Sequence, residues 1–158
     1  MDHIPGGWPI YRFIRDSKFW LKSNYQRLTK GYANVEAWNL CYYSAAYILP
    51  RLKHLRQNLH GYPSNLAQEG SKYEDDFKKW QEILDKMIFS FEYIVNEDKY
   101  EDLCYPPGYD FSTANMLKDM KNPESEKLKP DFDKLIPYEE KYKEGMELFA
   151  KHFRDLWD

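Results

Sequence analysis

The sequence has little cysteine and no long apolar run. Its two cysteines, Cys41 and Cys104, lie far apart and have no CxxC neighbour, which excludes a disulfide framework and a zinc site built from paired cysteines. We expect Cys41, which falls on an apolar helical stripe, to be a small buried hydrophobic residue. No run of 18 or more apolar residues occurs, so we expect no membrane span. The first residues, MDHIPGGWPIYRF, contain no continuous apolar stretch, so we also expect no signal peptide and a reducing cytosol.

Motifs of the common catalytic sites are missing as well. There is no Walker loop, no GxGxxG and no GxSxG. The four histidines share no metal-ligand spacing and no ExxH pair exists, so a di-iron carboxylate bundle lacks its ligands. We therefore expect no cofactor and favour a protein that is not an enzyme.

Charge is unevenly distributed over the 158 residues. Residues 1–59 carry nine Lys or Arg against three acids, and the remainder carries 14 against 23. One interpretation is that the two parts attract each other and pack; the other is that the basic part binds an anion. The length and the 18% aromatic content predict a packed core within one domain over 1–158.

Apolar spacing of three and four residues predicts an all-α fold. We expect a helix over 10–30, a second from an Asn34 cap to residue 59 that is kinked at Pro50, and a third from a Ser71 capping box to residue 95. A last helix begins at Pro137. Residues 96–137 read as a long irregular insertion with a short helix over 112–121. The simplest architecture is a bundle of about four main helices.

A basic segment beside aromatic residues is the candidate ligand site. Arginine and lysine would neutralise phosphate, and an aromatic ring would stack on a base. The phosphate-binding candidates are Arg51, Lys53, Arg56, Arg12 and Arg15, and the rim or stacking candidates are His60, Tyr62 and Trp38. The alternative is an exposed helix face followed by a turn that Gly61 and Pro63 stiffen, with Tyr62 packing the loop onto the bundle.

Carboxylate pairs at helical spacing are a second candidate. Glu82 and Asp85, together with Glu144 and Glu147, would supply hard oxygen ligands to magnesium, as in all-α nucleotide pyrophosphohydrolases. Their order and separation do not match that family, and a solvated acidic face is the alternative.

The stretches GYANVEAWNLCYYSAAYILPRLKHL, HGYP and WQEILDKMIFSFE resemble a family of bacteriophage proteins without an assigned activity. The matching positions within residues 27–95 include Gly31, Trp38, Gly61 to Pro63, Trp80 and Glu92. The resemblance implies a phage-encoded protein that acts in the host cytoplasm.

The expected function is a non-enzymatic binding protein. It would counter host defence by sequestering a nucleotide-type signal or by blocking a host defence protein. A magnesium-dependent nucleotide hydrolase and a structural or regulatory helical protein that forms a homo-oligomer or docks on a partner are the alternatives. Overall acidity and the lack of a recognition helix argue against nucleic-acid binding.

Overall fold

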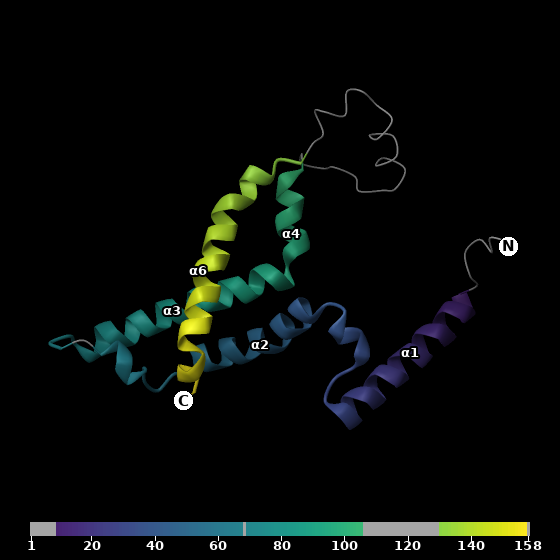
Figure 1. Ribbon diagram of the computed structural model, residues 1–158, viewed down its shortest axis with the longest axis horizontal. Coiled ribbons are helices and arrows are strands. Elements are labelled where there is room, and N and C mark those ends of the chain that lie inside the picture. Colours follow the sequence, from purple (N-terminus) through teal and green to yellow (C-terminus); the bar gives the residue numbers. More distant parts are fainter. Residues whose placement is uncertain (1–8, 68, 106–129, 158) are drawn as a thin grey trace. The chain divides into compact units, whose positions relative to one another are not determined.

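Every regular element that the structure describes is a helix, so the predicted all-α class is confirmed (Figure 1). The structure is a computed structural model, and it describes residues 9–67, 69–105 and 130–157, with the backbone alone for 9–15. The α-helices are α1 (Pro9–Lys30), α2 (Leu40–Gln57), α3 (Tyr73–Val95), α4 (Glu97–Glu101) and α6 (Ile136–His152). None of the described helices combines the length and apolar character that crossing a bilayer requires.

The chain divides into two compact units, Met1–Tyr43 and Ser44–Asp158. The first unit consists of α1, a 3₁₀ helix η1 (Asn34–Ala37) and the first residues of α2. After α1 the chain turns at Gly31, whose φ of 82° favours glycine. The Arg27 Nε then donates to Glu36 Oε1 at 2.7 Å, and the Ala33 N–H donates to Glu36 Oε2 at 3.0 Å. The hydrogen bonds from Arg27 and Ala33 lower the pKa of Glu36, so its carboxylate ties η1 to the end of α1.

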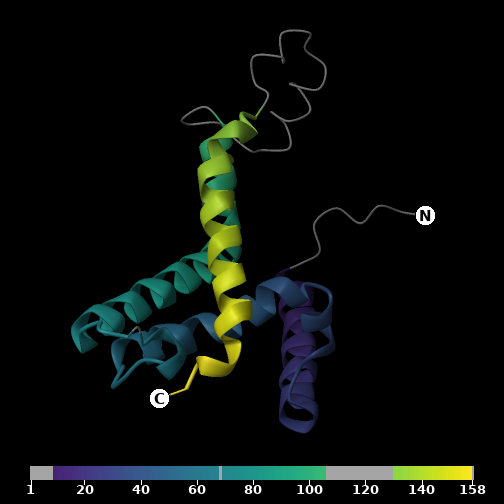
Figure 2. The ribbon, with the colours of Figure 1, turned by 60° about the vertical axis from the view of Figure 1, so that its left-hand side comes forward.

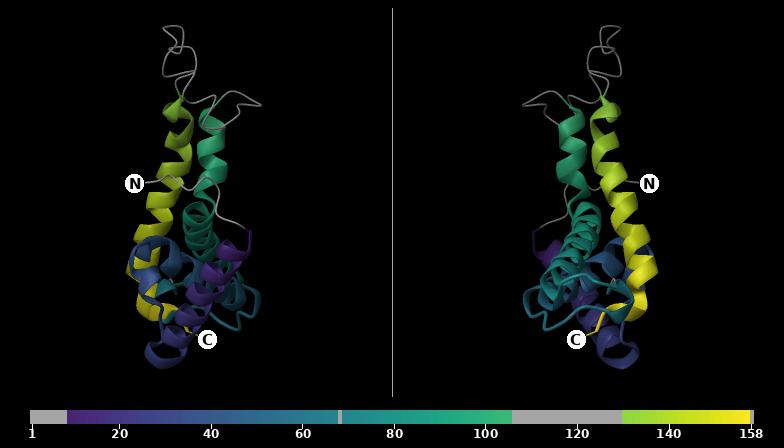
Figure 3. Two further views of the ribbon diagram at one scale, coloured as in Figure 1. Left: turned by 90° about the vertical axis from the view of Figure 1, so that its right-hand side faces the viewer. Right: turned by 90° about the vertical axis from the view of Figure 1, so that its left-hand side faces the viewer.

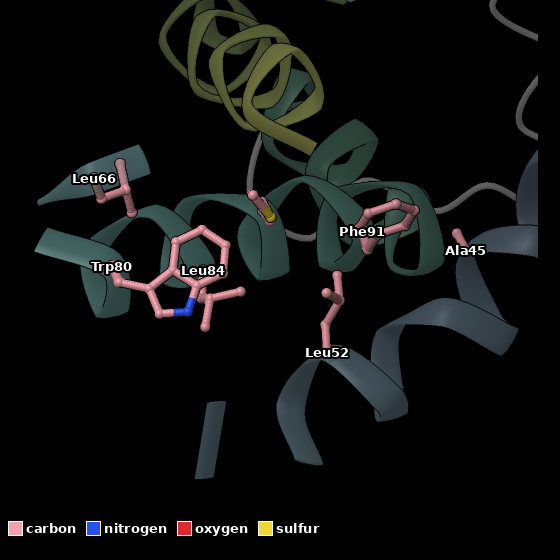
Figure 4. Packing of buried hydrophobic residues seen from close by; sticks show 7 residues of the cluster. Ala45, Leu52, Leu66, Trp80, Leu84 and Phe91 are labelled. Carbon is pink, nitrogen blue, oxygen red and sulfur yellow. The ribbon is translucent and has the colours of Figure 1, made fainter. Parts of the chain in front are cut away.

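The second unit is built on α2, α3 and α6. Helices α2 and α3 run antiparallel, and α6 packs across α3 (Figures 2 and 3). The buried core residues are Ala45 and Leu52 from α2, Leu66 from the 3₁₀ helix η2 (Ser64–Leu66), and Trp80, Leu84, Met87 and Phe91 from α3 (Figure 4). Helix α6 joins this core through Phe149, whose ring meets Phe91 edge-on at 4.8 Å.

The crossing of α3 and α6 depends on two small residues. The side chain of Ser90 is fully buried and donates from Oγ to the Tyr142 carbonyl at 2.8 Å. Opposite it, a Cβ added to Gly145 would lie closer than 3.0 Å to Ser90 Oγ and to the Lys86 carbonyl oxygen. Glycine at position 145 therefore lets the two helices approach closely.

Two ion pairs join α2 to α3. Lys53 Nζ lies 2.5 Å from Glu92 Oε1, and Arg56 binds both carboxylate oxygens of Asp85 at 2.8 and 3.1 Å. At these positions the basic residues of the first third pack against acidic residues of the remainder, which is the first of the two interpretations of the charge distribution.

Several predicted helix boundaries are correct and several are not. Helix α1 ends at Lys30, α3 ends at Val95, and Pro137 lies in the first turn of α6, all as predicted. The Asn34 cap is wrong, because Asn34 begins η1 and α2 begins only at Leu40. The Ser71 capping box is also wrong: Lys72 is the N-cap of α3, and Ser71 Oγ instead donates to the buried carboxylate of Asp76.

Other expectations are corrected or stay open. Cys41 is exposed, whereas Cys104 is buried, so the expected burial of Cys41 is wrong. The buried residues of α2 are Ala45 and Leu52. Pro50 lies inside α2, which continues to Gln57; the kink and the single domain stay predictions.

The region expected to be irregular begins and ends with helical turns. Helix α4 and the 3₁₀ helix η3 (Asp102–Cys104) follow α3, and the 3₁₀ helix η5 (Phe132–Leu135) precedes α6. Helix α4 lies beside the first part of α6 (Figures 1 and 3), where the rings of Tyr100 and Tyr138 are 5.1 Å apart. The short helix predicted over 112–121 lies outside the described residues.

Candidate functional site

The cations predicted to bind phosphate are largely engaged within the chain. Lys53 and Arg56 form the ion pairs with α3, and Arg51 donates to the Tyr47 carbonyl at 2.6 Å while its guanidinium covers the Tyr47 ring at 3.5 Å. A phosphate that recruited Lys53 or Arg56 would have to compete with a carboxylate already in place.

Two of the predicted rim residues, Tyr62 and His60, also make contacts within the chain. Tyr62 packs on the core, its ring lies 5.1 Å from that of Tyr73, and its hydroxyl donates to Asp76 at 3.4 Å. Burial, followed by the neighbouring Asp76 charge, raises the pKa of Tyr62. These contacts match the alternative interpretation, in which Tyr62 packs the loop. His60 is exposed, and its carbonyl accepts from the Tyr73 hydroxyl at 3.2 Å.

The remaining candidates belong to the first unit. Trp38 is 92% exposed, and Arg12 and Arg15 lie on α1, where only the backbone is described. The structure therefore does not bring the eight predicted residues together as one site within either unit.

A hollow of about 490 Å³ lies instead along α3 and α6 of the second unit. Its charged lining consists of Lys79, Glu82 and Lys86 from α3 and of Glu144 and Lys151 from α6. Its apolar wall is made by Leu66, Ile83 and Leu148. Lys86 and Glu144 neutralise each other, with Nζ and Oε1 2.6 Å apart. Among the described residues, Lys79 and Lys151 form no ion pair.

The last residue of α6, His152, also lines this hollow and is 2% exposed. Its Nδ1 lies 2.9 Å from Asp155 Oδ2 in the following 3₁₀ helix η6 (Phe153–Asp155). The same oxygen accepts from Asn65 Nδ2 at 3.1 Å. The Trp80 ring meets the imidazole edge-on with centroids 5.5 Å apart. Nε2 of His152 is buried and has no hydrogen-bond partner among the described residues.

The charge state of Asp155 determines the imidazole tautomer. The hydrogen bonds from His152 and then from Asn65 lower the pKa of Asp155, so the carboxylate is ionised at neutral pH and only accepts hydrogen bonds. The proton of a neutral imidazole must then be on Nδ1, which leaves a lone pair on Nε2. In its neutral form His152 therefore presents an oriented hydrogen-bond acceptor at Nε2.

The carboxylates considered for magnesium are divided between different surroundings. Glu82 and Glu144 line the hollow, Asp85 is paired with Arg56, and Glu147 is exposed. No group of three His, Cys, Asp or Glu side chains in the described part of the chain is placed to hold a metal ion. The nearby lysines also favour an anion in the hollow over a cation.

Sequence reasoning missed most of the residues that line the hollow and named only Glu82 and Glu144, as candidate magnesium ligands. It tested His152 only for metal-ligand spacing, although Asp155 three residues later is a local signal for an imidazole–carboxylate pair. No local signal marks Asn65, which is 90 positions from its partner Asp155.

Comparison of the chain with protein-family models, with curated proteins and with solved structures finds no match. The bacteriophage resemblance of residues 27–95 therefore stays a prediction, and the geometry of the hollow is the basis on which a function is proposed.

Proposed function

We propose that this protein is a non-enzymatic binding protein that takes a small phosphate-bearing ligand, of nucleotide type, into the hollow along α3 and α6. The observation that carries the proposal is the pair Lys79 and Lys151, whose side chains line the hollow without a carboxylate partner among the described residues. Lysine binds phosphate as a compact point charge. The volume falls within the usual range of small-molecule sites, roughly 300–1,000 Å³.

The proposed binding site is the hollow along α3 and α6, and not the basic segment of α2 that the sequence predicted. Lys53 and Arg56 already neutralise Glu92 and Asp85, so their use for a ligand would break ion pairs that join two helices. Lys79 and Lys151 carry no such cost, and the apolar wall that includes Ile83 and Leu148 suits a base or sugar face.

The bacteriophage resemblance supports the biological setting. A phage-encoded binding protein would act in the host cytoplasm and counter host defence by sequestering a nucleotide-type signal. Sequestration needs affinity and no chemistry, which agrees with the lack of catalytic motifs in the sequence.

Calorimetric titration tests the proposal. The panel consists of inorganic phosphate, AMP, ADP and cyclic dinucleotides, each with and without magnesium. Lys79→Gln with Lys151→Gln should weaken binding about 100-fold, because each charge-assisted hydrogen bond contributes roughly 1.5 kcal/mol or more. The control, Lys78→Gln with Lys143→Gln, changes the net charge equally on exposed positions outside the hollow lining. Flat titrations across the panel would refute the proposal.

The exposed apolar face of α1 favours a second candidate, the blocking of a host protein. Trp20, Leu21, Tyr25 and Leu28 are all at least 60% exposed and recur at helical spacing. Such a face fits an apolar groove on a partner. Pull-down from host lysate with wild type and with Leu21→Ser/Leu28→Ser, together with light scattering, tests it; a monomer that captures nothing counts against it.

A further inference from the structure

The imidazole of His152 is an unusual polar group among the described residues. Its ring is 2% exposed and forms part of the lining of the hollow, yet Nε2 has no hydrogen-bond partner among the described residues. Buried polar atoms in folded proteins are nearly always partnered, and each exception calls for an explanation. A ligand group in the hollow would supply the missing partner.

The other side of the ring is firmly held. Nδ1 lies 2.9 Å from Asp155 Oδ2, and Asn65 fixes the same carboxylate oxygen at 3.1 Å. Trp80, itself buried, packs edge-on against the imidazole. A ring held from two sides cannot rotate to partner Nε2 elsewhere without breaking the bond to Asp155. The orientation is therefore built into the fold before any ligand binds.

We propose that His152 is the specificity-determining contact of the hollow, where Nε2 accepts a hydrogen bond from an O–H or N–H group of the ligand while Lys79 and Lys151 hold its phosphate. The inference rests on the proposed function and deepens it. It selects phosphate-bearing molecules with a hydroxyl or amino donor, such as nucleoside phosphates, over bare tetrahedral anions.

Charged residues of both signs line the hollow beside the imidazole. Lys79, Glu82 and Lys86 face the hollow from α3, and Glu144 and Lys151 face it from α6. On the other side of the ring, the Asp155 carboxylate lies 2.9 Å from Nδ1. Nε2 is closed off from solvent, so ligand contact requires a shift of the side chains that cover it.

Two substitutions at position 152 separate contact from positioning. His152→Asn retains an amide near the Nδ1 position, where it reaches Asp155, and removes the Nε2 position. His152→Gln retains an amide near the Nε2 position. Both are titrated with AMP, which has O–H and N–H donors, and with sulfate, a tetrahedral anion without a donor at neutral pH.

We expect His152→Asn to weaken AMP binding about tenfold, the effect of one hydrogen bond, and to leave sulfate binding unchanged. His152→Gln should retain most of the AMP affinity. If both variants bind AMP as wild type does, or if His152→Asn weakens sulfate equally, the inference is overturned while the proposed function stands. If the wild type binds nothing, both fall.

Imidazole ¹⁵N spectra of the ligand-free full chain provide an independent test. The signal of His152 is the one that disappears from the spectrum of His152→Asn. The remaining histidine signals of that spectrum report whether the variant is folded. We expect a protonated Nδ1 and an unprotonated Nε2 near neutral pH, and a shift of the Nε2 signal when AMP is added. A protonated Nε2 would overturn the inference whatever the titrations show.

Discussion

Substitution of Gly145 by alanine tests the packing on which the hollow depends. An added Cβ would lie closer than 3.0 Å to Ser90 Oγ and to the Lys86 carbonyl oxygen, and 2.9 Å from the Lys86 carbonyl carbon. Ordinary van der Waals contact begins at 3.4 Å. The Ser90 hydroxyl can rotate, but the backbone of α3 cannot, so α3 and α6 must separate.

Opposing contributions determine the size of the effect. Overpacking costs about 1–3 kcal/mol, and separation of the helices also weakens the Ser90 bond to the Tyr142 carbonyl, which contributes about 1 kcal/mol. Alanine regains about 1 kcal/mol of helix propensity over glycine. We expect Gly145→Ala to lower the free energy of unfolding by about 1–3 kcal/mol and the Tm by about 2–12 °C.

Urea unfolding followed by circular dichroism measures this change, with an unchanged m value as the check on two-state behaviour. The matched control is Gly61→Ala, because nothing lies within 4 Å of a Cβ at Gly61 and its φ is not in the left-handed region. The control should remain within about 0.5 kcal/mol of wild type. Ser90→Ala in the Gly145→Ala background should recover only part of the loss, because the Lys86 backbone still obstructs the Cβ. A Gly145→Ala variant as stable as wild type would refute the reasoning.

Three further predictions concern the charged groups. A double-mutant cycle of Arg56→Ala and Asp85→Ala should give a coupling free energy of about 0.5–1 kcal/mol, because the pair is bidentate but partly exposed; no coupling would show that Arg56 is free for a ligand. The lowered pKa of Asp155 means that its ionised form stabilises the folded state above the unfolded pKa of about 3.9 and that this stability is lost as pH falls through the folded pKa. Asp155→Asn should therefore lose stability at pH 7 and show a smaller further loss on acidification to pH 3 than wild type; parallel pH profiles in thermal melts would contradict this. Finally, nucleotides incubated with magnesium and concentrated protein should release no phosphate, because the lysines that line the hollow with Glu82 and Glu144 oppose a bound cation; phosphate release that Glu82→Gln abolishes would instead support a hydrolase.

The sequence by itself determined the helices and the fold class. Apolar residues at three- and four-residue spacing mark α1, α3 and α6, and Pro137 marks the first turn of α6, because helix formation depends on neighbours within one or two turns. The caps at Asn34 and Ser71 were predicted wrongly because both residues have another role in the folded chain. Ser71 donates a hydrogen bond to buried Asp76, and Asn34 begins the 3₁₀ helix η1.

Only the tertiary structure decided the environment of each charge. Lys53 and Arg56 look like free cations in the sequence, but their carboxylate partners come from α3, with Asp85 29 positions from Arg56. Lys79 and Lys151 look like ordinary surface lysines, yet the crossing of α3 and α6 at Gly145 places them around one hollow. Electrostatic interactions act through space over a few ångströms, so the packing of distant segments, and not local spacing, determines which charges are neutralised and which remain for a ligand.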